Sequence, residues 1–192
     1  MPKNIVILDL ESSSLEADAG IIIGAGLLTE KGRTAEYFEA RKTNQEKTLL
    51  NNLIERLAKQ DVIVTWAGNG FDIPYLTTRL LKHGIDPEIF LSKTCLDLNE
   101  IVKRNLRLTF TYLDHVCEFF NIERKNPLMG LDVPFLYVRA MEGDVSALKK
   151  IKQHCLDDLR VTREVFLKLK PLLGRELLLE DSERSIDSKK QS

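Results

Sequence analysis

The sequence predicts one α/β domain with a mixed central sheet flanked by helices. Three β-type segments come first, an amphipathic helical segment then leads into a continuous apolar run, and mostly helical segments follow. The first three segments are close enough in sequence to form an antiparallel meander. Because a helix separates them from the fourth, the fourth strand is expected to lie parallel to the first.

The elements follow from periodicity and turn residues. Strands are expected at 4–10, 20–28 and 35–39, a helix at 46–60 and a buried strand at 61–66. Further along, the pattern predicts a helix at 73–83, a short strand within 91–98, and helices at 99–105, 111–120, 133–142 and 144–170. The glycines in "GIIIGAG" indicate bulges or close packing in a strand. Residues 1–172 form the expected domain, and 173–192 a polar C-terminal tail expected to be disordered at its end.

Composition excludes several classes of protein. The formal net charge of −1 argues against tight non-specific binding to long duplexes, but not against action on a strand end, where metal ions supply positive charge. Three scattered cysteines without a C-x-x-C pair predict a reduced, intracellular chain. Apolar runs are too short to span a bilayer and no cleavable signal is expected, so a cytoplasmic location without membrane contact is predicted.

Two carboxylates stand two positions apart in the first strand. Asp9 and Glu11 of "DLE" face the same side, because side chains alternate along a strand. Like charges on one face repel unless something positive lies between them. A metal ion, an arginine or water are the alternatives at this point.

Two further acidic signals follow. Asp72 of "GFDIP" stands where a strand end meets a helix start, so it either caps the helix or belongs to a ligand-binding loop. His154 and Asp158 of "HCLDD" lie four apart on one helical face, whereas Asp157 points away. An ordinary solvated pair is the alternative for these two. Asp97 is expected to cap the helix that follows it.

Taken together, carboxylates from a strand, a loop and a late helix are typical of a site for two hard divalent cations, Mg²⁺ or Mn²⁺. Two such ions activate a water molecule and stabilise the leaving oxygen of a phosphodiester. His154 is then a candidate general base for that water.

The spaced set "DLE", "GFD" and "HCLDD" resembles the three exonuclease motifs of the DEDD superfamily, which has a ribonuclease H-like fold. The similarity is to the branch of 3′–5′ exonucleases related to the proofreading domain of B-family DNA polymerases. "WAGNGFDIPYLTTR" is similar to its second motif, and "GLDVPFLYVRAMEGDVSALKKIKQHCLDDLRVT" to the approach to the third. The resemblance covers residues 4–170.

The resemblance implies a metal-dependent 3′–5′ exonuclease acting on a single-stranded 3′ end of DNA or RNA and releasing nucleoside monophosphates by a two-metal mechanism. It implies metal ligation by Asp9, Glu11, Asp72 and Asp158. His154 would orient or deprotonate the attacking water.

Residues 12–15 follow the first motif, where relatives contact the terminal nucleotide. The resemblance implies that Leu15 wedges against the last base and that the backbone of Ser12 and Ser13 meets the sugar. Phe71 stacks on a base or packs in the core. Arg79 contacts a phosphate or pairs with an acid.

Three positions depart from the family pattern. Ala67 stands where many relatives carry asparagine, Ser14 where glycine is frequent, and His154 at the four-residue spacing usual for tyrosine. Two rival interpretations stay open. One is a non-catalytic module of the same fold that binds nucleic-acid ends or a protein, and the other is a structure-specific endonuclease.

Overall fold

A computed structural model describes residues 3–126 and 128–190, with side chains described as far as Gly174. Its centre is a five-stranded sheet in the order β3-β2-β1-β4-β5. The strands are β1 (Ile5–Ser12), β2 (Ile22–Thr29), β3 (Glu36–Glu39), β4 (Val62–Thr65) and β5 (Thr94–Asp97). Each corresponds to a strand expected from the sequence.

The pairing of the strands makes the sheet mixed. β1 pairs antiparallel with β2, and β2 antiparallel with β3, which is the predicted meander. β4 lies parallel to β1 and β5 parallel to β4, as a helical connection requires. The predicted α/β class with a mixed sheet is therefore confirmed.

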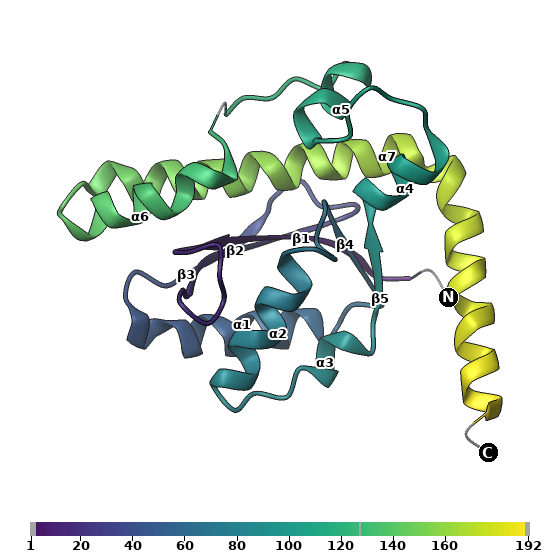
Figure 1. Ribbon diagram of the computed structural model, residues 1–192, viewed down its shortest axis with the longest axis horizontal. Coiled ribbons are helices and arrows are strands. Elements are labelled where there is room, and N and C mark those ends of the chain that lie inside the picture. Colours follow the sequence, from purple (N-terminus) through teal and green to yellow (C-terminus); the bar gives the residue numbers. More distant parts are fainter. Residues whose placement is uncertain (1–2, 127, 191–192) are drawn as a thin grey trace.

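Helices cover both faces of the sheet (Figure 1). One face carries α1 (Glu46–Leu57), α2 (Asp72–Lys82) and α3 (Glu88–Leu91), and the other carries α4 (Leu98–Asn105), α5 (Leu113–Phe119), α6 (Val133–Met141) and α7 (Val145–Lys190). Short 3₁₀ turns lie at η1 (Thr43–Gln45) and η2 (Gly130–Asp132). The sequence did not predict α3, η1 or η2, because a single turn is too short to show a helical period.

The alternation of β1 assigns its residues to the two faces. Val6 and Leu8 pack in the core beneath α1 and α2, whereas Ile7 packs in the core under α7. Asp9 and Glu11 continue the odd-numbered set and therefore face α7. The strand that carries the first acidic pair thus presents it to the helix that carries the third motif.

Gly26 of β2 allows α7 to approach the sheet closely. It lies opposite Asp9 in the antiparallel register. A Cβ at this position would lie 2.5 Å from Leu159 Cδ1 and 2.6 Å from Cys155 Sγ, so a larger residue would push the helix away. Of the two explanations expected for these glycines, close packing applies at Gly26.

Helix α7 is longer than expected. It runs from Val145 to Lys190, contains Pro171, and changes direction in its yellow part (Figure 1). The expected helix end at 170 is therefore wrong, and the expected tail is helical over 173–190, while 191–192 lie outside the described residues. The division into a 1–172 domain and a tail stays a prediction. Within the described part of the chain, no helix combines the length and apolar character needed to cross a lipid bilayer.

Candidate functional site

A cavity of about 540 Å³ opens at the carboxyl ends of the parallel strands β1 and β4. This edge is where α/β proteins place ligands. The five expected catalytic residues all line it: Asp9, Glu11, Asp72, His154 and Asp158. Segments far apart in the sequence therefore meet at one place.

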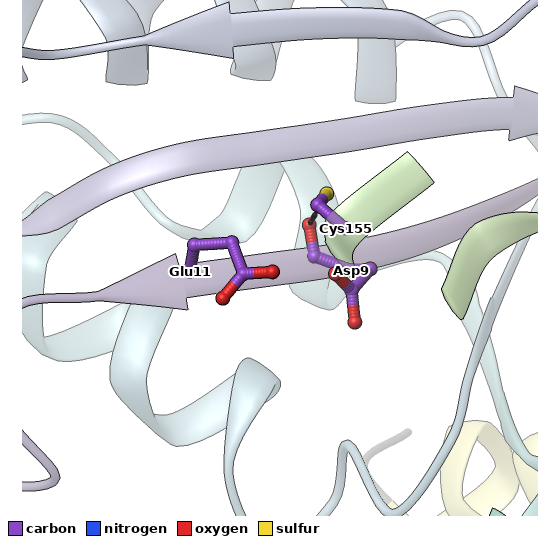
Figure 2. Close-up of side chains that lie close together, drawn as sticks. All are labelled: Asp9, Glu11 and Cys155. Atoms are coloured by element: carbon purple, nitrogen blue, oxygen red, sulfur yellow. Dashed lines mark hydrogen bonds between the residues drawn. The ribbon is translucent and has the colours of Figure 1, made fainter. Parts of the chain in front are cut away.

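Asp9 and Glu11 project from the end of β1, and Figure 2 shows both carboxylates beside the strand. The β1–β2 register shifts between Glu11 and Ser12, directly after the pair. Only 4% of Glu11 is exposed. Its buried Oε1 has no hydrogen-bond partner among the described residues. Such an atom is costly to bury unless a further group binds it.

Asp72 is the first residue of α2, and its carboxylate turns toward β1. Its Oδ1 accepts a hydrogen bond from the backbone N–H of Leu10 at 3.1 Å. The N-cap position of α2 belongs to Phe71, which makes no side-chain cap. Asp72 is therefore not the N-cap of α2, and it lines the cavity; its binding of a ligand stays a prediction.

His154 and Asp158 lie one turn apart on α7. His154 Nδ1 is 3.5 Å from Asp158 Oδ1. Burial, assisted by the positive charge of Arg124, lowers the pKa of His154 to about 4, so its ring is neutral at pH 7. A neutral imidazole has one nitrogen able to accept a proton.

The carboxylates repel one another in this half-enclosed space. Burial, followed by the charges of neighbouring carboxylates, raises the pKa of both Asp9 and Glu11 well above the ordinary values. Burial is also the main reason why the pKa of Asp72 and that of Asp158 rise to about 7. Arg124, whose Nη2 lies 2.8 Å from Asp158 Oδ1, offsets only part of this effect, so burial and mutual repulsion still raise the pKa of all four carboxyls.

A divalent cation fits this arrangement. The donor set consists of carboxylate oxygens, which are the ligands that Mg²⁺ and Mn²⁺ prefer. A bound cation would favour the ionised carboxylates and provide a partner for Glu11 Oε1. The unpartnered oxygen and the shared repulsion thus support metal binding by Asp9, Glu11, Asp72 and Asp158.

Cys155 lies close to the first acidic pair without matching it chemically. Its sulfur and one carboxylate oxygen each of Asp9 and Glu11 lie within 4.8 Å of one another (Figure 2). The thiol donates a hydrogen bond to the backbone carbonyl of Asp9 at 3.9 Å. Burial raises the pKa of this thiol well above its usual value, which keeps it protonated. Cys155 therefore packs α7 against β1 and is a poor ligand for a hard cation.

The expected substrate residues divide into two groups. Ser12, Leu15 and Phe71 line the cavity, and Leu15 is 54% exposed. Ser13 is not among the lining residues, and its Oγ accepts the backbone N–H of Ile21 at 2.9 Å. Ser13 therefore supports the turn after β1.

Arg79 does not reach the cavity. It is 1% exposed, and its Nε and Nη2 lie 2.8 Å and 2.6 Å from the two carboxylate oxygens of Glu46. Its Nη1 donates to the carbonyl of Ala17 at 2.8 Å. Of the two roles expected for Arg79, the structure shows the pairing with an acid, and Arg79 is not among the residues that line the cavity.

Sequence reasoning missed two residues at the site. Arg124 Nη2 lies 2.8 Å from Asp158 Oδ1. Tyr112 lines the cavity and is 56% exposed. Arg124 stands in a segment between helices, where no periodic pattern places a side chain. Tyr112 falls within the helix expected at 111–120, directly before the observed start of α5, and belongs to no motif that would mark it as a site residue. The acids that pair with Arg124 are Asp114, Asp157 and Asp158, and none of them is close enough in sequence for a local pattern to predict the pairing.

Asp97 connects the loop before Asp72 to the start of α4. Its carboxylate caps α4 by accepting the N–H of Asn99 at 2.9 Å, as expected. It also accepts the N–H groups of Ala67 at 3.0 Å and Asn69 at 3.1 Å. Ala67 has a φ of +56°, a conformation that asparagine adopts more readily than alanine. Where many relatives carry asparagine, this chain therefore has an alanine in a left-handed backbone conformation that alanine adopts less readily, and Asp97 holds that turn through hydrogen bonds.

Comparisons with known proteins agree with this geometry. Residues 6–170 match the RNase_H superfamily. A DNA polymerase of Methanocaldococcus jannaschii is 31% identical over 118 residues, which cover 48% of this chain and 7% of that protein. The family B DNA polymerase of the hyperthermophilic archaeon Pyrobaculum calidifontis superposes with a TM-score of 0.77 at 23% identity, over 90% of this chain and 25% of that chain.

This chain thus spans only a small part of either polymerase. The polymerase structure shares its fold at a sequence identity too low to imply more. The family match extends from the start of β1 well into α7 and includes every element of the acidic site. The chain belongs to the RNase_H superfamily and is similar to archaeal family B DNA polymerases.

Proposed function

We propose that this protein is a metal-dependent 3′–5′ exonuclease that hydrolyses phosphodiester bonds at a single-stranded nucleic-acid 3′ end. One observation carries the proposal: four carboxylates from β1, α2 and α7 line one cavity, and two of their buried oxygens, Glu11 Oε1 and Asp158 Oδ1, have no hydrogen-bond partner among the described residues. The DEDD motif pattern and the similarity to family B polymerases support the same activity.

The proposed mechanism assigns a task to each residue. Two Mg²⁺ or Mn²⁺ ions, when bound by Asp9, Glu11, Asp72 and Asp158, supply an activated water and stabilise the leaving oxygen. His154 lines the cavity with a neutral ring and orients the attacking water or accepts its proton. Its low pKa makes orientation the larger part of this task.

The rim of the cavity supports an unpaired substrate. Leu15, Tyr112 and Leu131 line the cavity from three separate segments, and all three are exposed. Apolar and aromatic side chains pack against the faces of unpaired bases. In a duplex these faces are covered by the neighbouring base pairs. Because the chain carries a net charge of −1, the metal ions would provide the main attraction for the phosphates. A cytoplasmic location is part of the proposal and is supported by free thiols at all three cysteines.

The test compares Asp9→Asn and Asp158→Asn with the unmodified protein on matched 5′-labelled DNA and RNA oligomers. We expect Mn²⁺-dependent shortening from the 3′ end, abolished by EDTA, and a loss of more than about 100-fold in both variants, since even residues behind metal ligands contribute about 10–100-fold. Glu16→Gln changes an exposed acid near the same strand and should keep full activity.

The same assay separates the rival interpretations. Binding of oligomers without any shortening in Mn²⁺ would favour a non-catalytic module. Internal cuts in a strand blocked at its 3′ end would favour an endonuclease. Full activity in Asp9→Asn or Asp158→Asn would refute the mechanism.

A further inference from the structure

We propose that Arg124 is a positioning residue that holds the Asp158 carboxylate in the orientation needed to bind a divalent cation. The inference rests on the proposed metal site. Arg124 Nη2 lies 2.8 Å from Asp158 Oδ1, and the arginine side chain is only 16% exposed. Arg124 is not among the residues that line the cavity, so it approaches Asp158 from behind.

The backbone that carries Arg124 is fixed on α7. Asp157 Oδ2 accepts the N–H groups of Lys125 at 2.9 Å and Asn126 at 3.0 Å. Arg160 Nη2 lies 2.8 Å from Asp157 Oδ1 and also donates to the carbonyl of Glu123. Helix α7 therefore holds the chain on both sides of Arg124. The two neighbouring acids of "HCLDD" have different tasks, because Asp157 fixes this segment while Asp158 faces the cavity.

The guanidinium of Arg124 is held in place by more than one acid. Its Nε lies 3.2 Å from Asp114 Oδ1 and 3.9 Å from Asp157 Oδ2, while Nη2 meets Asp158. A planar guanidinium with several fixed partners cannot follow a rotating carboxylate. Asp158 Oδ1 makes no hydrogen bond with the described residues, so its 2.8 Å ion pair with Arg124 is the contact that restrains it, as partners behind metal ligands generally do.

A positioning role and a purely electrostatic role of Arg124 predict opposite results for cation binding when the arginine is replaced. If Arg124 acted only through its positive charge, removing it would strengthen the binding of a cation to the acidic site. If Arg124 positions Asp158, removing it frees the carboxylate and weakens binding. The direction of the change therefore decides between the two.

The experiment measures Mn²⁺ binding by calorimetry, without nucleic acid, in the unmodified protein and in Arg124→Gln, Arg124→Lys and Arg163→Gln. We expect Arg124→Gln to weaken Mn²⁺ affinity about 10–100-fold. Arg124→Lys should have an intermediate Mn²⁺ affinity, because it keeps the positive charge but loses the planar guanidinium with its fixed set of donors. Arg163 is the matched control, since it lies on α7 and donates to the carbonyl of Glu30 at 2.6 Å, away from the cavity. Its variant should bind like the unmodified protein.

Several outcomes would overturn the inference. Unchanged or tighter Mn²⁺ binding in Arg124→Gln would refute it, and so would equal losses in the Arg124 and Arg163 variants. Thermal melting of each variant shows that it is folded at the assay temperature. If Arg124→Gln is not, Arg124→Lys decides, and unchanged affinity there refutes the positioning role. Absence of Mn²⁺ binding in the unmodified protein would instead overturn the proposed metal site itself.

Discussion

At the scale of single residues, the cavity concentrates negative charge in a place that water reaches poorly. Burial, together with neighbouring acids, raises the pKa of Asp72 and of Asp158 to about 7, from an ordinary value of 3.8. Without a cation, Asp72 and Asp158 therefore stay protonated in the folded protein at pH values between about 3.8 and 7, where the same groups are ionised in the unfolded chain. The proposed metal ions and these protons compete for the same oxygens.

This competition predicts how stability depends on pH. Because the folded-state pKa values lie above those of the unfolded chain, the stability from the protonated carboxyls is complete below about pH 3.8 and is lost as pH rises through about 7. In EDTA, the melting temperature should fall between pH 5 and pH 8. In Mn²⁺, which needs ionised ligands, the added stability should grow over the same range.

Thermal unfolding followed by circular dichroism in the two buffers checks this expectation. Asp158→Asn serves as the control, since it removes one of the titrating groups and should flatten the slope in EDTA. A melting temperature that rises with pH in EDTA would contradict the proposed origin of the shifts.

At the scale of elements, the site depends on how closely α7 approaches the sheet. Gly26 leaves room for Leu159 and Cys155, and Cys155 in turn donates to the Asp9 carbonyl. The distance between the first and third motifs is therefore set by a residue that touches no substrate.

Replacing Gly26 with alanine tests this dependence. A new Cβ only 2.5 Å from Leu159 Cδ1 would force the helix or its side chains to shift, at a cost of about 1–3 kcal/mol. We expect urea unfolding to show this loss and Mn²⁺ affinity to fall as Asp158 moves. Gly174→Ala is the matched control, because nothing lies within 4 Å of its Cβ and the change should not destabilise the protein. Unaltered stability and Mn²⁺ binding in Gly26→Ala would refute this account of the helix position.

At the scale of the whole molecule, a buried ion pair on the far side of the sheet joins α1 to α2 through two residues that do not line the cavity. Glu46 of α1 pairs with Arg79 of α2, meets His83 at 2.8 Å and accepts the N–H of Ile22 of β2 at 2.8 Å. Burial opposes the charge of Glu46, but the hydrogen bonds from Arg79 and His83 lower its pKa overall. The pair therefore stabilises the layer of helices opposite α7.

This separation predicts that stability and metal binding respond differently to a change at Arg79. Arg79→Met leaves Glu46 buried without its main partner, which should cost about 3–5 kcal/mol in chemical unfolding. The folded fraction should bind Mn²⁺ with normal affinity, because Arg79 does not line the cavity. Arg56→Met breaks an exposed pair with Glu36 and should cost less than about 1 kcal/mol. If folded Arg79→Met protein binds Mn²⁺ normally but loses nuclease activity, the result would instead support contact between Arg79 and a phosphate of the substrate.

Sequence patterns predicted most of this architecture because their signals are local. Alternation and helical spacing located the five strands and all but the shortest helices, with ends displaced by a few residues at most except in α7. The same local rules placed Asp9 with Glu11 and His154 with Asp158. Their meeting with Asp72 was expected from strand topology and from family motifs, and the cavity brings them together.

By itself, the sequence determined the class of fold, the order of the elements and the acidic residues of the cavity, because each of these depends on near neighbours or on a recognisable motif. Only the tertiary structure decided which basic residue meets which acid. Arg79 turns to Glu46 and Arg124 to Asp158, across 33 and 34 positions of sequence. Such pairings depend on how non-periodic segments are held in space, and no local pattern of residues encodes that.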